Sequence, residues 1–217
     1  MTLPEMKSHW EQVYSTKATD AVSWYQLHAS VSLSLIGETG IDLGAPIIDV
    51  GGGASTLVDD LLDLGYSALS VLDLSEAALD AAANRLGARG DGVRWLEADI
   101  TRTTLPEASI DLWHDRAVFH FLNEADDRAA YVRNLCQAVK PGGHLIIGSF
   151  AENGPERCSE LPVQRYSAQG LYSHFSAAFE LVTTTTEPHH TPSGSIQAFV
   201  YCWCRRRVER SVHKARD

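Results

Sequence analysis

The sequence has few of the features that mark secreted, membrane-spanning or disulfide-rich proteins. Its four cysteines, Cys136, Cys158, Cys202 and Cys204, are too few and too irregularly spaced for a disulfide framework. No run approaches the roughly 18 apolar residues of a membrane span, and the N-terminal segment lacks the apolar core of a signal peptide. We therefore expect a cytoplasmic protein with reduced, packed cysteines and no membrane partner.

Positive charge is also scarce, because 18 Lys and Arg face 28 Asp and Glu, a formal net charge of −10. An acidic surface repels a phosphate backbone, so no nucleic-acid partner is expected. The one basic cluster lies at the C-terminus, where we expect residues 206–217 to form a solvated, disordered tail. Metal ligands are lacking too: His174, His189 and His190 have no acid or cysteine at ligand spacing, which predicts no metal.

What the sequence does have is a regular alternation of short apolar runs and helical patterns. Strands are predicted at 46–50, 68–74, 93–98, 110–115, 144–150, 179–186 and 196–204, and helices at 5–16, 28–38, 55–64, 75–86, 124–139 and 167–176. Strands that alternate with helices indicate one α/β domain, with a mostly parallel sheet and helices on both faces. The last two strands lack a helix between them, so they should pair antiparallel.

Candidate ligand-binding residues follow the first three predicted strands. Gly51-Gly52-Gly53 permits a sharp turn before a helix N-terminus, which offers free N–H groups. Asp73 ends the second strand and can accept both hydroxyls of a ribose, and Asp99 after the third can hold an adenine amino group. In open α/β sheets the carboxyl ends of the strands carry the ligand site, so these groups should meet there. Dinucleotide binding uses similar groups, which keeps NAD open as an alternative.

The motifs IIDVGGGAS, VLDLS, LEADI, DLWHDRAVFHFL and VKPGGHLIIGSF resemble those of class I methyltransferases that use S-adenosylmethionine (SAM). The resemblance covers residues 46–205 and implies a Rossmann-like sheet of seven strands, the last one antiparallel and inserted between the fifth and sixth. It implies that SAM is the cofactor. By position, Asp49, Gly51 and Gly53 would line its methionine part, Asp73 its ribose, and Leu74, Asp99 and Ile100 its adenine. The glycine-rich turn has Ser55 where many members have another glycine.

The stretch after the fourth strand should face the methyl donor, because this strand borders the same crevice. Arg116, His120 and Asp115 are its candidate catalytic residues, and His114 and Phe119 its candidate cofactor contacts. The alternative is that Asp115 and Arg116 form a structural ion pair and that His120 is a core histidine.

The same stretch, with Asp126-Asp127-Arg128 and the loop from Gly154, is loosely similar to thiopurine and thiol methyltransferases. That similarity implies a small soft acceptor, a thiol or related chalcogen compound, activated by a neighbouring cation. A protein lysine methyltransferase, a methyltransferase acting on a carboxylate or phenol, and a non-catalytic SAM-binding module remain alternatives. The sequence leaves monomer and homodimer open.

Aromatic residues gather in the first 45 residues, ahead of the predicted sheet. Trp10, Tyr14, Trp24 and Tyr25 resemble the aromatic lid of the thiol methyltransferase group. A sulfonium cation is attracted to aromatic faces, so residues 1–45 are predicted to form a helical lid, with Trp10 and Tyr14 touching the cofactor. The alternative is that these rings pack the N-terminal helices onto the domain.

Overall fold

A computed structural model describes residues 3–208 and has the predicted seven-stranded mixed sheet, in the order β3-β2-β1-β4-β5-β9-β8. Its strands are β1 (Ile47–Val50), β2 (Leu69–Asp73), β3 (Arg94–Glu97), β4 (Ile110–Arg116), β5 (Val139–Phe150), β8 (Phe179–His190) and β9 (Ile196–Arg206). Its helices are α1 (Leu3–Thr16), α2 (Ser30–Thr39), α3 (Leu57–Asp63), α4 (Glu76–Leu86), α5 (Ala125–Ala138) and α6 (Ala168–Ser173). Only β9 runs against its neighbours, so β8 points the same way as the first five strands. The fold class and the antiparallel last strand are confirmed.

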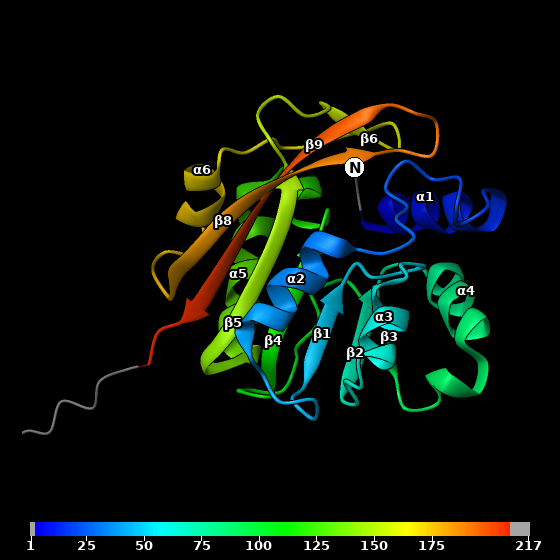
Figure 1. The fold of residues 1–217 in the computed structure, drawn as a ribbon. Coiled ribbons are helices and arrows are strands. Elements are labelled where there is room, and N and C mark those ends of the chain that lie inside the picture. The colour runs from blue at the N-terminus through cyan, green and yellow to red at the C-terminus, as the bar shows by residue number, and fades with distance from the viewer. Residues whose placement is uncertain (1–2, 209–217) are drawn as a thin grey trace, which may run out of the picture.

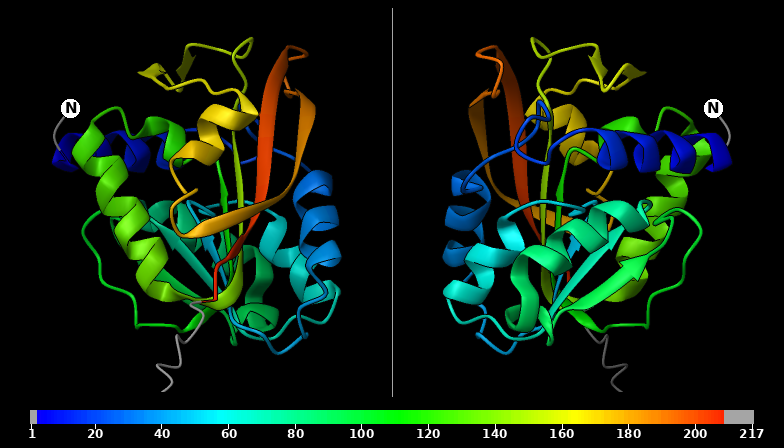
Figure 2. Two further views of the ribbon diagram at one scale, coloured as in Figure 1. Left: turned by 90° about the vertical axis from the view of Figure 1, so that its left-hand side faces the viewer. Right: turned by 90° about the vertical axis from the view of Figure 1, so that its right-hand side faces the viewer.

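Helices cover both faces of the sheet because side chains of each central strand alternate between two buried cores. Ile47 packs with α2, α3 and α4 on one face, whereas Ile48 packs with α5 and α6 on the other. Figure 2 shows α5 and α6 on one side of the sheet and α2 and α3 on the opposite side. Neighbouring strands buried on both faces explain why β1 and β2 are almost wholly apolar in sequence.

Several element ends differ from the sequence prediction. The predicted helix at 124–139 ends at Ala138, and the Pro141-Gly142-Gly143 turn lies inside β5 rather than ahead of it. Gly142 has φ +81° within β5, where the register against β4 shifts between the pairs Ile110–Val139 and Leu112–His144. The final hairpin is longer than predicted, because β8 runs to His190 and is joined to β9 by only 191–195. Helix α3 begins at Leu57, two residues later than predicted.

Two short strands that were not predicted, β6 (Arg157–Cys158) and β7 (Leu161–Pro162), form a small separate hairpin. Two-residue strands are too short to leave a period in the sequence. At the C-terminus, β9 extends through Arg206, and residues 209–217 of the predicted tail lie outside the described residues. Within 3–208, no helix is long and apolar enough to cross a membrane, and no group of three potential metal ligands is found.

Helix α1 lies across the carboxyl ends of the first strands (Figure 1). It is fixed there by Glu11, whose carboxylate accepts hydrogen bonds from the backbone N–H groups of Glu76 and Ala77 at 2.6 and 3.3 Å. Those N–H groups belong to the first turn of α4, where a carboxylate is favoured by the helix dipole. An ion pair between Lys7 and Glu97 adds a second attachment. The N-terminal segment thus covers the edge of the sheet at which ligand sites form.

Candidate functional site

A cavity of about 380 Å³ opens at the carboxyl ends of β1, β2 and β4, beneath α1. Its volume is in the range of small-molecule sites. The described residues that line it come from most of the N-terminal two thirds of the chain: Pro4, Met6, Trp10, Tyr14, Trp24, Val50, Gly51, Leu72, Asp73, Leu74, Ala98, Asp99, Ile100, Thr101, Arg102, Arg116, Ala117, Val118, Phe121, Leu122, Asp127 and Cys158. Eight of the fourteen predicted site residues line the cavity: Trp10, Tyr14, Gly51, Asp73, Leu74, Asp99, Ile100 and Arg116.

The glycine-rich turn brings backbone against the cavity at Gly51. This residue has φ +71°, and a Cβ added to it would lie 1.9 Å from Val118 Cγ2. Glycine is therefore needed both for the conformation and for the close approach. Gly53 lies outside the lining, where a Cβ would come within 2.7 Å of Asp73 Oδ2, so its role is to let the turn pack on the end of β2.

Asp73 places a buried carboxylate at the end of β2. Its Oδ1 accepts the Ser75 backbone N–H at 2.9 Å, and Ser75 in turn caps α4. Burial raises the pKa of Asp73 to about 7, the Ser75 hydrogen bond opposes this, and the nearby Asp49 carboxylate adds to it. An acceptor with one oxygen already used and the other beside the turn suits a ligand that donates hydroxyl hydrogen bonds.

The loop after β3 supplies a second carboxylate and apolar surface. Asp99 Oδ1 accepts from the backbone N–H and the hydroxyl of Thr101, at 2.8 and 2.7 Å. Ile100 is buried beside it, and Leu74 lines the cavity from the end of β2. Apolar side chains with a carboxylate at their edge fit a flat heteroaromatic ring with an exocyclic amine.

Asp49 and His114 face a smaller neighbouring cavity of about 50 Å³, which shares Tyr14, Trp24, Gly51 and Arg116 with the larger one. His114 is 2% exposed and hydrogen-bonded through both ring nitrogens, to Asp49 Oδ1 at 2.7 Å and Ser32 Oγ at 2.8 Å. The histidine therefore holds the Asp49 carboxylate from behind the turn. Ser32 was not predicted, and a serine inside α2 gives no sequence signal for this contact.

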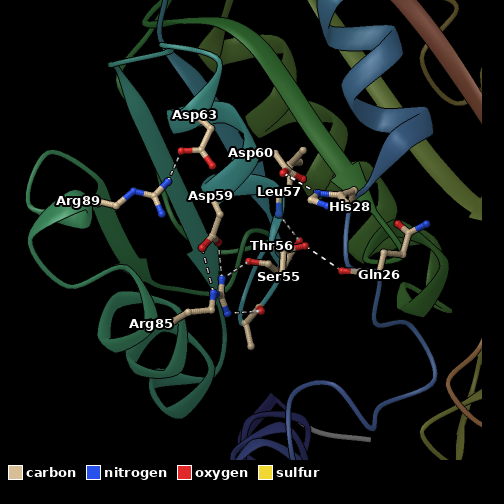
Figure 3. A network of polar contacts seen from close by, with 11 residues as sticks. Gln26, His28, Ser55, Thr56, Leu57, Asp59, Asp60, Asp63, Arg85 and Arg89 are labelled. Carbon is tan, nitrogen blue, oxygen red and sulfur yellow. Dashed lines mark hydrogen bonds and ion pairs between the residues drawn. The ribbon is translucent and has the colours of Figure 1, made fainter.

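The turn is supported from both sides by the polar network of Figure 3. From α4, Arg85 donates to the carbonyls of Ala54 and Ser55 and pairs with Asp59 of α3. On the N-terminal side, the Thr56 hydroxyl donates to the Gln26 carbonyl at 2.9 Å. The segment that follows the glycines is thus tied to α4 and to the N-terminal segment at once.

The candidate catalytic residues after β4 separate in the structure. Arg116 lines both cavities. Asp115 is fully buried and accepts from the N–H groups of Val118 and Phe119 and from the Tyr131 hydroxyl, so it fixes the chain turn rather than reaching the cavity. Burial raises its pKa to about 6, and the hydrogen bond from the Tyr131 hydroxyl limits this rise.

His120 and Phe119 are also directed into the core. His120 packs against the Phe121 and Phe150 rings at 4.5 and 4.7 Å, with both ring nitrogens buried and without a hydrogen-bond partner among the described residues. Burial, together with a smaller contribution from the Arg116 charge, lowers its pKa to about 3. Phe119 is fully buried against Tyr131 and Phe175. The turn after β4 ends in a short 3-10 helix, and this reverses the side-chain directions that strand periodicity implies.

Arg116 itself is held in place by four groups. Its Nε donates to the Tyr201 hydroxyl at 2.9 Å and its Nη1 to the Trp24 carbonyl at 3.2 Å. Its Nη2 lies 3.5 Å from Glu187 Oε2, and its Cζ sits 4.2 Å above the Phe199 ring. Sequence reasoning missed Glu187, Phe199 and Tyr201, because only the β8–β9 hairpin brings them to β4.

An aromatic cluster closes the cavity beneath α1. Trp10 contacts Trp24 at 5.6 Å and Phe121 at 5.2 Å, ring centroid to centroid, and Tyr14 hydrogen-bonds the Trp24 indole. Tyr25 lines only the smaller cavity. Cys158, on the β6–β7 hairpin, completes this end, and the Ser159 hydroxyl beside it contacts His9 of α1 at 3.2 Å. The cavity therefore has one end formed by carboxylates and aliphatic side chains and another formed by aromatic rings, a thiol and a guanidinium.

Comparisons with known proteins agree with this arrangement. A family model described as a methyltransferase domain matches residues 48–147. The eEF1A lysine and N-terminal methyltransferase of Mus musculus is 25% identical over 216 residues, which cover 89% of this chain and 30% of that protein. The chain spans less than a third of the length of the three eEF1A methyltransferases that it matches.

Solved structures share the fold over nearly the whole chain. The structure from "Conversion of a Disulfide Bond into a Thioacetal Group during Echinomycin Biosynthesis" has a TM-score of 0.74 and 22% identity, over 95% of this chain and 93% of that one. The 1,6-didemethyltoxoflavin-N1-methyltransferase of Burkholderia thailandensis, solved with its substrate and S-adenosylhomocysteine, has a TM-score of 0.72 and 19% identity, over 96% and 92%. The chain therefore has a Rossmann-like methyltransferase fold, and its residues 48–147 match a methyltransferase domain.

Proposed function

We propose that the enzyme transfers the methyl group of SAM to a small soft nucleophile, a thiol or related chalcogen compound, bound beside Arg116. The observation that carries this proposal is the composition of the cavity's aromatic end. It presents a buried guanidinium, and no histidine lines the cavity among residues 3–208. An acceptor that ionises close to neutral pH suits such a site, because a cation favours the thiolate and no base is needed.

The cofactor would lie along the other end of the cavity. Asp73 would accept from the ribose hydroxyls, and Leu74, Ile100 and Asp99 would surround the adenine. The backbone at Gly51 would approach the methionine part, with Asp49 and His114 behind it in the smaller cavity. The sulfonium would then lie near the Trp10 and Trp24 rings, whose faces attract a cation. In this arrangement the N-terminal segment, predicted as a lid over residues 1–45, would cover the cofactor.

SAM supplies a methyl group on a positively charged sulfur, which makes that group reactive without a metal. The protein's part is alignment, since orientation alone can contribute effective molarities of about 10⁵ M or more. Arg116 favours the thiolate, whose proton is lost to solvent. The thiolate sulfur forms a bond to the methyl carbon as the carbon–sulfonium bond breaks, which leaves a thioether and S-adenosylhomocysteine.

Release of S-adenosylhomocysteine in the presence of sulfide, methanethiol and aromatic thiols tests this proposal. We expect thiol-dependent release that falls at least tenfold in Arg116→Ala, while the exposed-site control Arg89→Ala, whose only described partner is Asp63 on the surface, keeps wild-type rates. Calorimetry of S-adenosylhomocysteine binding would show that the cofactor site of Arg116→Ala is intact. No release with any thiol, despite normal cofactor binding, would exclude this acceptor class.

Protein lysine methylation is the second candidate, because the eEF1A relatives carry that activity in their names. A lysine must lose its proton before it can attack, and its reference pKa is about 10.4, so a base or strong desolvation is required. Transfer of labelled methyl groups from SAM to extract proteins, but not to small thiols, would favour this candidate. Cofactor binding without turnover on either would indicate a non-catalytic module.

The monomeric or homodimeric state and the cytoplasmic location stay predictions of the sequence.

A further inference from the structure

A buried ion pair joins the cavity to the hairpin on the far side of β5. The Arg116 and Glu187 side chains are each about 10% exposed, and Glu187 Oε2 lies 3.5 Å from Arg116 Nη2. Arg116 ends β4, whereas Glu187 lies on β8, three strands away in the sheet. The register of the sheet brings the two together: Tyr201 of β9 pairs with Gly148 of β5, which pairs with Arg116, and Glu187 pairs with Phe199, two residues from Tyr201. Figure 1 shows the β8–β9 hairpin beside β5.

Glu187 is held in a fixed position by neutral donors. The Tyr201 hydroxyl donates to its Oε2 at 2.7 Å and accepts from Arg116 Nε, so the tyrosine bridges the two charges. The Gln26 side-chain amide donates to its Oε1. Both carboxylate oxygens are therefore satisfied, and the carboxylate has no freedom to turn away from Arg116.

This pair determines the charge of the aromatic end of the cavity. Arg116 and Arg102 are the two basic side chains among the described lining residues, and Arg102 follows the adenine-side loop after β3 and is 70% exposed. A buried guanidinium without a counter-charge would attract any anion that enters. Glu187 offsets this attraction from behind without lining the cavity, while the guanidinium N–H groups can still stabilise a thiolate sulfur by hydrogen bonding.

We propose that Glu187 is a specificity-determining residue, whose charge offsets that of Arg116 so that the acceptor end selects thiols with uncharged substituents over thiols that carry a further anionic group. This deepens the proposed function, since it assumes that the aromatic end receives the acceptor. The titratable groups that face the pair are His120 from the turn after β4, Cys158 from β6, His189 from β8 and Tyr201 from β9. Burial keeps the pKa of His120 and His189 low and that of Cys158 at about 12, so all of them stay neutral at neutral pH.

Cys158 offers a probe that does not depend on knowing the acceptor. Its thiol lines the cavity and senses the Arg116 charge. Iodoacetate and iodoacetamide alkylate a thiolate by the same displacement of iodide, but only the first is anionic. The ratio of their rates at Cys158, measured by peptide mass spectrometry, reports local charge and cancels any change in the thiol's own pKa.

We expect Glu187→Gln to raise the iodoacetate-to-iodoacetamide ratio at Cys158 about fivefold or more, because the amide keeps an acceptor for Tyr201 but removes the charge. Glu187→Asp, which keeps the charge, should restore a ratio close to wild type. Glu180→Gln, on an exposed position of the same strand, should not change it. Cys136, on α5, supplies an internal reference whose ratio should stay constant in every variant. An unchanged ratio at Cys158 in folded Glu187→Gln would overturn the proposal.

A second experiment measures turnover of two thiols that differ in charge. With mercaptoethanol and thioglycolate as neutral and anionic thiols, Glu187→Gln should raise relative kcat/KM for thioglycolate about tenfold. A changed alkylation ratio without turnover of either thiol by the wild type would support the role of Glu187 and contradict the proposed acceptor. If the wild type turns over thiols but Glu187→Gln changes neither the alkylation ratio at Cys158 nor the relative kcat/KM of the two thiols, the proposed acceptor class is supported and the role of Glu187 is contradicted.

Discussion

The two ends of the cavity are built in different ways. The carboxylate end comes from three short stretches at or just after the ends of three strands: 50–51 at β1, 72–74 at β2 and 98–102 after β3. The aromatic end gathers side chains from α1, the segment at Trp24, the turn after β4 and the β6–β7 hairpin, with Glu187 and Tyr201 behind them. The first end is therefore fixed by local turns on a rigid sheet, and the second by long-range packing. Substitutions should separate the two.

Gly51→Ala should have the largest effect on the carboxylate end. The alanine would have to adopt φ near +71°, and its Cβ would lie 1.9 Å from Val118 Cγ2. The turn must therefore move away from the cavity. We expect S-adenosylhomocysteine binding, measured by calorimetry, to weaken about 100-fold or more. Gly37→Ala is the matched control, since a Cβ there meets nothing within 4 Å in the last turn of α2. That variant should bind normally and gain roughly 0.5–1 kcal/mol of stability. Normal cofactor binding by Gly51→Ala would contradict the placement of the methionine part at this turn.

Asp73→Asn tests the same end through pH. Because burial raises the pKa of Asp73 to about 7, the carboxylate is protonated below neutral pH and ionised above it. If the ionised form accepts the ribose hydroxyls, wild-type affinity for S-adenosylhomocysteine should fall about tenfold per pH unit below 7. The asparagine variant should bind roughly 30-fold more weakly at pH 8 and lose that pH dependence. Asp80→Asn, exposed on α4, controls for general charge effects. Parallel pH profiles for wild type and Asp73→Asn would place the ribose elsewhere.

Trp10→Ala should affect the aromatic end more gently. Trp10 lies outside both buried core clusters, so its loss should leave the melting temperature of the cofactor-free protein little changed. SAM binding should weaken about tenfold, and S-adenosylhomocysteine binding less, because only SAM carries the sulfonium charge. Trp10→Phe, which keeps an aromatic face, should recover most of the affinity. An equal loss of cofactor affinity and apo-protein stability would indicate instead that Trp10 packs α1 onto the domain.

The same difference explains how much the sequence could predict. Gly51, Asp73, Leu74, Asp99 and Ile100 all line the cavity, because strand ends of a parallel sheet meet at one edge; their contacts with the cofactor stay predictions. The antiparallel hairpin follows from the alternation of elements, whereas the strand order was implied by the resemblance to methyltransferases. The site residues contributed by turns could be located from local patterns alone.

Side-chain direction after β4 could not be predicted in that way. Asp115 and His120 are close to Arg116 in sequence, yet both are buried in the core. Tyr131 donates a hydrogen bond to Asp115, and His120, in the 3-10 helix, packs against the Phe150 ring. Three of the four groups that hold Arg116, namely Glu187, Phe199 and Tyr201, lie about 70 or more residues further along the chain, on a hairpin whose length was underestimated. Contacts between distant strands depend on register and twist, and neither leaves a short-range pattern.

His120→Phe should have the smallest effect on turnover, and it tests most sharply whether His120 belongs to the core rather than to the cavity. Both imidazole nitrogens are buried without partners among the described residues, between two phenylalanine rings, and an unsatisfied buried donor costs about 1–3 kcal/mol. A phenyl ring should therefore raise the free energy of unfolding by roughly 1 kcal/mol at pH 7.5. Burial lowers the pKa of folded His120 to about 3, whereas the unfolded residue titrates near 6.5. Its neutral state contributes stability above pH 6.5 that is lost as the pH falls towards 3, at about 1.4 kcal/mol per unit. Phenylalanine does not titrate, so urea unfolding should show the advantage of the variant growing on acidification, with kcat/KM for the acceptor within twofold of wild type. A gain in stability accompanied by a large loss of turnover would show that His120 takes part in the reaction. The aromatic end of the cavity would then extend deeper into the core than its lining residues indicate.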